Sequence, residues 1–373
     1  MAQLSYASSD AQTRKLFSKK LLVEALRDSP IGLFMGEMTE DPEAVICLKK
    51  EPQSAAGDTV TVSLQRQLSG DGVQGTTPLE GSEESMSEFT MAISLGELRH
   101  ADKMEVKGMT PQRVQYDKDP RVRLKNALKD WWEERMATAF YNQVCGNTST
   151  DIVGTKYTGE NATVAADANH AFFGGAVATA ELCAAATEAF SLTKIDRMVA
   201  AAKTFKLSDS NGVPLKPANI GGKKRYALVL HPYQVYDLRT STTTGQWLDI
   251  TKSLYMGKGE ENPITKGLKG EFQIVGEYNG VLICQDPRIP KGQNSTTAAP
   301  VANTRRSVFL GAGALTAAFG MGYGSGQMDW VEKTFDYDKW LGIATGLVWG
   351  LKKTRFNSLD YGCMTLTTYT SLG

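Results

Sequence analysis

Residues 57–102 read GDTVTVSLQRQLSGDGVQGTTPLEGSEESMSEFTMAISLGELRHAD, and this stretch decides the fold. Two runs within it alternate apolar with polar or small residues, which is the pattern of a half-buried β-strand. The apolar positions are Val60, Val62 and Leu64 in the first run and Phe89, Met91, Ile93 and Leu95 in the second. The residues between the runs are rich in Gly, Ser and Thr, so the stretch predicts a long β-hairpin with a polar, turn-rich tip.

The predicted hairpin tip, residues 69–88, is acidic. It contains five carboxylates and no basic residue, the acids being Asp71, Glu80, Glu83, Glu84 and Glu88. A loop of this length is uncommon in a compact domain unless it has a function. The tip is therefore either a solvated loop or an extended arm that lies across a partner, in which case these acids make an inter-subunit contact.

The second strong signal is a helix over residues 120–145. Asp119 suits its N-cap, Pro120 its first turn and Gly146 the position after its end. Its 26 residues give a rod of about 39 Å, well beyond the length of a mean helix. The predicted apolar face comprises Val122, Leu128, Trp131, Trp132, Arg135, Ala139 and Phe140. We interpret Trp131, Trp132 and Phe140 as residues that pack the helix, rather than as a cofactor cage.

The remaining segments predict a mixture of helices and strands. Leucines at helical spacing predict a helix over residues 13–28, which Pro30 ends. We expect further helices at 178–190, at 194–206 behind a Thr193–Asp196 capping box, at 231–240 and, briefly, after residue 311. We expect strands at 225–230 and 305–311, a hairpin around Asn279–Gly280, and strands in most of the segment after residue 327.

The composition of the 373 residues excludes several classes of protein. Lys plus Arg and Asp plus Glu are both 41, so the chain lacks the basic excess of a freestanding nucleic-acid binder. The five cysteines include no CxxC pair and the three histidines have no metal-binding spacing, so we predict neither disulfides nor a metal site. The N-terminus lacks the apolar segment of a signal peptide. The uncharged residues 307–328 contain too many glycines and polar residues for a membrane span.

No catalytic constellation is apparent in the sequence. Gly320–Gly326 suggests a phosphate-binding loop, but a strand-like segment follows it where the dinucleotide motif requires a helix. His231 precedes Pro232 at a strand-to-helix turn that suits a catalytic histidine, although no GxSxG motif or evident nucleophile accompanies it. The basic clusters Lys223–Arg225 and Lys352–Arg355 are either solvated or face nucleic acid or the acidic hairpin of a neighbour. We predict that the protein is not an enzyme and binds no cofactor.

Several stretches resemble the major capsid proteins of tailed phages, in the family named after the capsid protein of phage N4. The most specific segments are LEGSEE (79–84), DWWEERM (130–136) and GLVWGLKKTRFN (346–357). The matching stretches follow the order of the family and cover well over half of the chain. Residues 147–190 have no match, and we interpret them as a variable insert.

This resemblance implies an α+β protein with the HK97-like capsid fold. In that fold an N-terminal arm and an extended loop embrace neighbouring subunits, and they would be residues 1–56 and 57–104. A spine helix, residues 120–145, would belong to a peripheral domain built from residues 105–206 and 339–373. Residues 207–338 would form the axial domain, which meets its copies at the centre of each capsomer.

The implied function is that of a major capsid protein. Hexamers and pentamers would close into an icosahedral shell around double-stranded DNA, which they would enclose without sequence-specific binding. The protein would assemble in the host bacterial cytoplasm and reside in the virion capsid, without contact to a membrane. Portal, scaffold or decoration proteins would be further partners. Two alternatives stay open: a related nanocompartment shell that encloses a cargo enzyme, and a nucleotide-binding enzyme that uses Gly320–Gly326.

Overall fold

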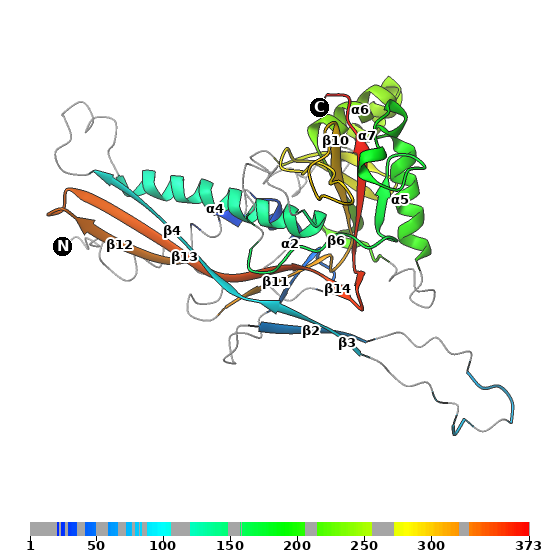
Figure 1. Ribbon diagram of the computed structural model, residues 1–373, viewed down its shortest axis with the longest axis horizontal. Coiled ribbons are helices and arrows are strands. Elements are labelled where there is room, and N and C mark those ends of the chain that lie inside the picture. The colour runs from blue at the N-terminus through cyan, green and yellow to red at the C-terminus, as the bar shows by residue number, and fades with distance from the viewer. Residues whose placement is uncertain are drawn as a thin grey trace.

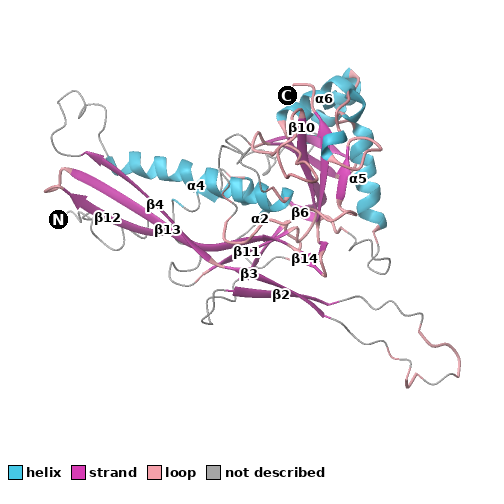
Figure 2. Cartoon of the chain, in the orientation of Figure 1, coloured by secondary structure: helices cyan, strands magenta, loops and turns pink. Residues whose placement is uncertain are grey.

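The computed structural model describes residues 21, 24–26, 29–35, 42–49, 59–65, 72–76, 79–81, 83, 88–105, 120–147, 157, 159–205, 215–255, 272–320 and 328–372. They form an elongated body from which one β-hairpin projects, as Figures 1 and 2 show. Two β-sheets make up the body, and the predicted α+β class is confirmed. The helices are α2 (Pro30–Met35), α4 (Pro120–Cys145), α5 (Leu192–Thr204), α6 (Pro232–Ser241) and α7 (Thr244–Tyr255).

The first sheet has five strands and lies along α4 (Figure 1). Its strands are β1 (Ile46–Lys49), β4 (Gly96–Glu105), β11 (Leu315–Phe319), β12 (Asp329–Phe335) and β13 (Trp340–Lys353). The long strand β13 organises the sheet, because it pairs with β4 on one side and with β12 and then β11 on the other. Strand β1 adds in parallel to β11.

The second sheet has seven strands and lies among α5, α6 and α7. Its strands are β5 (Ala171–Phe173), β6 (Ala218–Ile220), β7 (Lys223–Leu230), β8 (Gln273–Tyr278), β9 (Val281–Gln285), β10 (Thr304–Leu310) and β16 (Cys363–Tyr369). Apolar side chains of α5 pack against the middle of this sheet, where β7, β9 and β10 are almost fully buried. Two short pairs complete the fold: β2 (Thr59–Gln65) with β3 (Glu88–Ser94), and β14 (Arg355–Phe356) with β15 (Leu359–Asp360).

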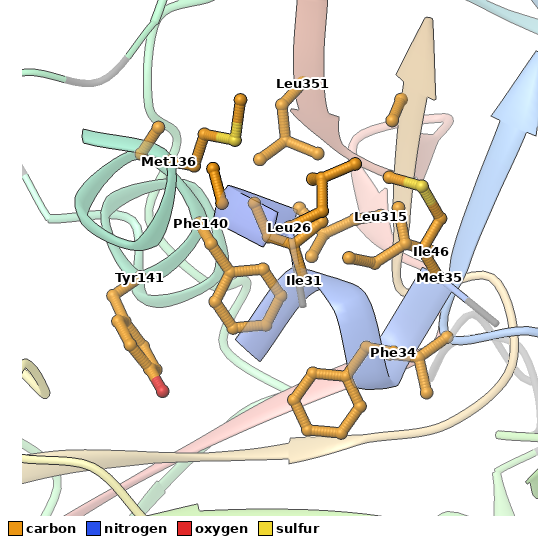
Figure 3. Packing of buried hydrophobic residues seen from close by; sticks show 14 of the residues in the cluster. Leu26, Ile31, Phe34, Met35, Ile46, Met136, Phe140, Tyr141, Leu315 and Leu351 are labelled. Atoms are coloured by element: carbon orange, nitrogen blue, oxygen red, sulfur yellow. The ribbon is translucent and has the colours of Figure 1, made fainter. Parts of the chain in front are cut away.

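Helix α4 lies over the five-stranded sheet and is anchored there by its tryptophan and phenylalanine side chains. Trp132 and Phe140 are fully buried. The indole Nε1 of Trp132 donates a hydrogen bond of 2.8 Å to Oγ1 of Thr345 on β13. Phe140 stacks on Phe34 of α2, with 5.8 Å between the ring centroids. Figure 3 shows how Met136 and Phe140 of α4 meet side chains of α2 and of the sheet in one continuous core.

Several predicted elements are confirmed. Helix α4 has the predicted bounds, and Gly146 after it has a left-handed φ of +62°, as a helix-ending glycine requires. The two alternating runs of residues 57–102 pair as β2 and β3. Asn279 and Gly280, both with positive φ, form the predicted turn between β8 and β9.

Three local predictions are wrong. The Ala-rich stretch after residue 311 is strand β11, because its alanines are buried between β1 and β13, where tertiary pairing outweighs helix propensity. Residues 178–190 form two short 3₁₀ turns rather than a helix. Helix α5 begins after Ser191, and Asp196 accepts hydrogen bonds from Tyr278 and Asn279 instead of closing a capping box.

Each of the two sheets combines segments from different predicted domains. Helix α5 and strand β16 both fall in segments expected to be peripheral. Strand β16 belongs to the seven-stranded sheet, and α5 packs its apolar side chains against that sheet. Strands β11 and β12 fall within 207–338, but both pair with β13 in the five-stranded sheet. After β10 the chain leaves the seven-stranded sheet and forms β11, β12 and β13 of the five-stranded sheet. It then returns to the seven-stranded sheet with β16, so neither sheet is built from one continuous stretch of sequence.

Truncation of Phe140 tests the core under α4. Because its ring is fully buried and stacked, Phe140→Ala should destabilise the folded chain by about 3–5 kcal/mol, measured from the urea midpoint. Val122 is predicted to face the core, but its side chain is 44% exposed on the same helix. Val122→Ala should therefore change stability by no more than about 0.5 kcal/mol. Equal midpoints for the two variants would contradict this account of the core.

Candidate functional site

The β2–β3 hairpin is the most distinctive surface feature of the molecule (Figure 1). The acids Glu80, Glu83 and Glu88 are exposed on it, while Asp71 and Glu84 lie outside the described residues. Leu79 lies beside Glu80 and is 60% exposed, the largest exposed fraction among the leucines that the structure describes. The described part of the tip therefore presents an exposed leucine beside exposed carboxylates.

The base of the hairpin is held firmly to the body. The Asn161 side chain accepts a hydrogen bond from the Ser94 backbone N–H and donates one to its carbonyl, at 3.0 and 2.9 Å. Lys352 Nζ donates to the carbonyl of Ala92 at 2.7 Å. A Cβ on Gly350 of β13 would lie 2.4 Å from the Ser94 carbonyl oxygen, so this crossing requires glycine. The insert that contains Asn161 thus fixes the direction in which the hairpin leaves the body.

Trp131 lies at the surface edge of α4 and takes part in a stack. Its ring lies parallel to that of His100 on β4, with 4.1 Å between centroids. The guanidinium of Arg135 lies 5.3 Å from the ring centroid of Trp131 on the same helix. His100 is therefore an exposed side chain of β4 that stacks on the helix through Trp131. The indoles of Trp131 and Trp132 also contact each other edge to face, with 5.2 Å between their ring centroids.

A buried arginine joins α4 to the segment after β9, and the sequence analysis missed it. The Arg288 guanidinium is only 5% exposed and contacts Glu134 at 2.8 Å, Glu133 at 3.3 Å and Asp286 at 3.4 Å. Glu133 and Glu134 are adjacent in sequence and diverge on a helix, yet both reach this one cation. The only sequence signal was an acidic pair beside the tryptophans on a core-facing helix.

The two basic clusters are mostly paired within the chain. Lys224 forms an ion pair of 2.7 Å with Glu43, and Arg225 one of 2.8 Å with Glu277. Lys353 is buried and contacts Asp360 at 2.8 Å. The interpretation of Lys352–Arg355 as a solvated or nucleic-acid-facing cluster is therefore wrong for Lys353, because its charge is neutralised in the interior.

The thiols show no sign of catalytic activation. All five cysteines lie in the described ranges as thiols, and only Cys47 is half-buried rather than buried. Burial raises the pKa of the Cys284 and Cys363 thiols, so both stay protonated and weakly nucleophilic. Among the described residues, no group of three or more His, Cys, Asp or Glu side chains is arranged to hold a metal ion.

His231 caps a helix rather than serving an open site. Its ring Nδ1 accepts a hydrogen bond of 3.1 Å from the backbone N–H of Tyr233, and the backbone N–H of His231 donates one of 3.0 Å to Gln234 Oε1. Burial, together with the nearby charge of Arg305, lowers the pKa of His231 to about 3. The imidazole is therefore neutral at physiological pH and acts as the N-cap of α6.

The glycine run also lacks the context of a nucleotide site. Gly320 directly follows β11, and its N–H donates to the carbonyl of Val348 on β13. The next described element is β12, a strand, where a dinucleotide loop leads into a helix. Residues 321–327 lie outside the described residues.

Comparison with known proteins identifies this architecture. The sequence matches the Phage capsid protein family over residues 5–372, which is almost the whole chain. The chain belongs to this family. The major capsid protein of Pseudomonas phage KPP25 is 25% identical over 387 residues, which cover 95% of this chain and 93% of that protein.

Solved capsid structures show the same fold as this capsid protein. The capsid of Ralstonia phage GP4 is similar over 99% of both chains, with a TM-score of 0.76 and 26% identity. The capsid of cyanophage Pam1 aligns over 100% of both chains with a TM-score of 0.62 and 16% identity. The head of Helicobacter pylori bacteriophage KHP40 has a TM-score of 0.61 and 13% identity, over 92% of this chain and 91% of its own. The HK97-like capsid fold implied by the sequence is confirmed.

Among the helices in the described part of the capsid protein, none combines the length and hydropathy needed to span a bilayer.

The cap on α6 predicts a pH dependence of stability. Below about pH 6.5 the unfolded chain protonates this imidazole, whereas the folded chain keeps it neutral until about pH 3. Folding is therefore destabilised as the pH falls through this window, by about 2–3 kcal/mol between pH 6.5 and 4.5. His231→Asn keeps a capping side chain that does not titrate, so its urea midpoint should fall less steeply over that range. Identical pH profiles for parent and variant would refute the assignment.

Proposed function

We propose that the chain is the major capsid protein of a tailed phage, and that its copies assemble as pentamers and hexamers into an icosahedral shell around double-stranded DNA. The observation that carries this proposal is the family match over residues 5–372. The projecting hairpin supports it, because its tip extends away from the body and reaches surface that only another molecule supplies (Figure 1). The resemblance of the LEGSEE, DWWEERM and GLVWGLKKTRFN segments supports a place in the narrower N4-type group.

We assign the parts of the capsid fold by sheet rather than by sequence range. The five-stranded sheet with α4 forms the peripheral domain, and α4 is its spine helix. The seven-stranded sheet with α5, α6 and α7 forms the axial domain. The β2–β3 hairpin is the extended loop, and the residues before β1 form the N-terminal arm. In this arrangement, the joint between the domains runs through Arg288 and its carboxylate partners on α4.

The hairpin lies over an adjacent subunit in the proposed shell. Its acids call for basic partners there, and salt at physiological concentration weakens such exposed contacts. DNA is enclosed rather than gripped, because a subunit with no net charge has little electrostatic affinity for phosphate. Assembly takes place in the cytoplasm of the host bacterium, with a portal and with scaffold or decoration proteins as further partners, and the product resides in the virion.

Electron microscopy of the purified chain tests the proposed function directly. Negative stain combined with sedimentation should show closed shells, or rings of five and six subunits. Shells from infected cells should contain genomic DNA. Shells that contain a protein cargo and no DNA would identify a nanocompartment instead. A chain that stays monomeric even with its phage's scaffold present would contradict the proposal, and thermal stabilisation by a nucleotide would then support the enzyme alternative.

The hairpin sequence also predicts the covalent state of the shell. Some HK97-like capsids join their subunits through a lysine of the extended loop, but residues 57–102 contain none. Boiled and denatured virions should therefore give a single band at the mass of the chain. A ladder of covalent multimers that persists in reductant would contradict this prediction.

A further inference from the structure

A cavity of about 380 Å³ lies at the base of the hairpin, between β1 and β2. It is lined by Cys47, Leu48 and Lys49 of β1 and by Val62, Ser63 and Leu64 of β2. Because neighbouring side chains in a strand point to opposite faces of a sheet, three consecutive lining residues show that the cavity reaches the edges of β1 and β2. Half of its lining comes from other segments, including Gly313, Thr316, Thr354, Phe356 and Tyr361, so the cavity also extends over β11 and the β14–β15 pair. We call this cavity the edge slot.

Both edges that border the edge slot lack a described partner strand. Among the described residues, β1 pairs only with β11, and β2 pairs only with β3. Strand spacings give about 160 Å³ for one residue of a packed strand, so the slot has room for two or three extended residues. Within the described residues, these two edges present backbone donors and acceptors to an added segment, as in β-strand addition.

The charge at the edge slot indicates which segment enters it. Lys49 lines the slot and makes no ion pair or side-chain hydrogen bond with any residue that the structure describes. Val62 and Leu64 supply apolar walls. The hairpin tip carries the matching groups, since exposed Leu79 is followed directly by exposed Glu80.

We propose that the hairpin tip of a second copy of this chain docks in the edge slot, with Leu79 between the apolar walls and Glu80 paired with Lys49. This inference rests on the proposed shell function and names the surface that receives the hairpin. The contact is head to tail, because the tip of one subunit enters the base of the next. Such a heterologous contact repeats around a ring until the ring closes.

The N-terminal segment is a less suitable occupant of the edge slot. Residues 1–20 contain four basic residues and one acid, so they would bring positive charge to Lys49. The hairpin tip between residues 69 and 88 has five acids and no base. Charge complementarity therefore favours the hairpin tip.

Disulfide trapping in assembled shells tests this contact with a thiol that the slot already contains. Leu79→Cys places a thiol on the tip, and Cys47 of the neighbouring subunit lies in the slot. Mild oxidation of Leu79→Cys shells should give a ladder of multimers on a non-reducing gel, and reductant should abolish it. The matched control is Leu79→Cys with Cys47→Ser, which keeps the tip thiol and should give no ladder.

A second cysteine pair covers the case in which the Cys47 thiol is too shielded to form a disulfide. Ser63 is exposed in the same slot, so Leu79→Cys with Ser63→Cys should also give the ladder. Shells that form normally but give no ladder with either pair overturn this inference and leave the proposed function standing. A ladder from Ser5→Cys with Cys47, in place of one from Leu79→Cys, assigns the slot to the N-terminal segment. Loss of shells in the unmodified chain would instead count against the proposed function.

A charge exchange tests the ion pair independently. Lys49→Glu should reduce the yield of shells, because it faces Glu80 of the neighbour with a like charge. Combining Lys49→Glu with Glu80→Lys should restore the yield. Glu83 is the control position, since its carboxylate accepts the Gly81 N–H within its own tip. Equal rescue by Glu80→Lys and Glu83→Lys would show that only bulk charge matters and would overturn the assigned pair.

Discussion

Both sheets of the capsid subunit depend on helix α4. Trp132 fixes the helix to β13 through a buried hydrogen bond to Thr345. Directly after Trp132, Glu133 and Glu134 bind Arg288. At the C-terminal end of the helix, Arg306 of β10 donates to the carbonyl of Cys145 at 2.9 Å. A buried guanidinium is costly unless several acceptors surround it, and the three carboxylates Glu133, Glu134 and Asp286 offset that cost in the joint. The helix therefore couples the positions of the two sheets.

The hairpin differs from the body in where its stabilising contacts come from. Its base is fixed to the body by the Asn161 amide, by Lys352 and by the close crossing at Gly350. Its tip contributes little to the core, and Leu79 there is exposed. A segment of this kind lowers its free energy by contact with another molecule. The direction of the arm is thus set within one chain, and its stabilisation comes from the next.

Local signals in the sequence were sufficient for α4 and for the hairpin strands. Pro120, Gly146 and the strict alternation around Val62 and Met91 act within a few residues, so composition and spacing report them directly. The alanines of β11 could not be read in this way, because their burial between β1 and β13 comes from partners far away in sequence. Charge was misread for the same reason, since the paired state of Lys353 depends on the β14–β15 turn. The edge slot has no sequence signature, because two separate strands create it.

The one-sided charge of the hairpin tip selects among possible associations. Two tips that met in a symmetric pair would bring ten carboxylates together with no cation between them, and this repulsion disfavours that dimer. A symmetric dimer would occupy both arms and end growth, so it is a dead end for a shell. Acidity at the tip therefore acts as a filter on assembly pathways. The acidic tip still permits the head-to-tail contacts from which rings and closed lattices are built.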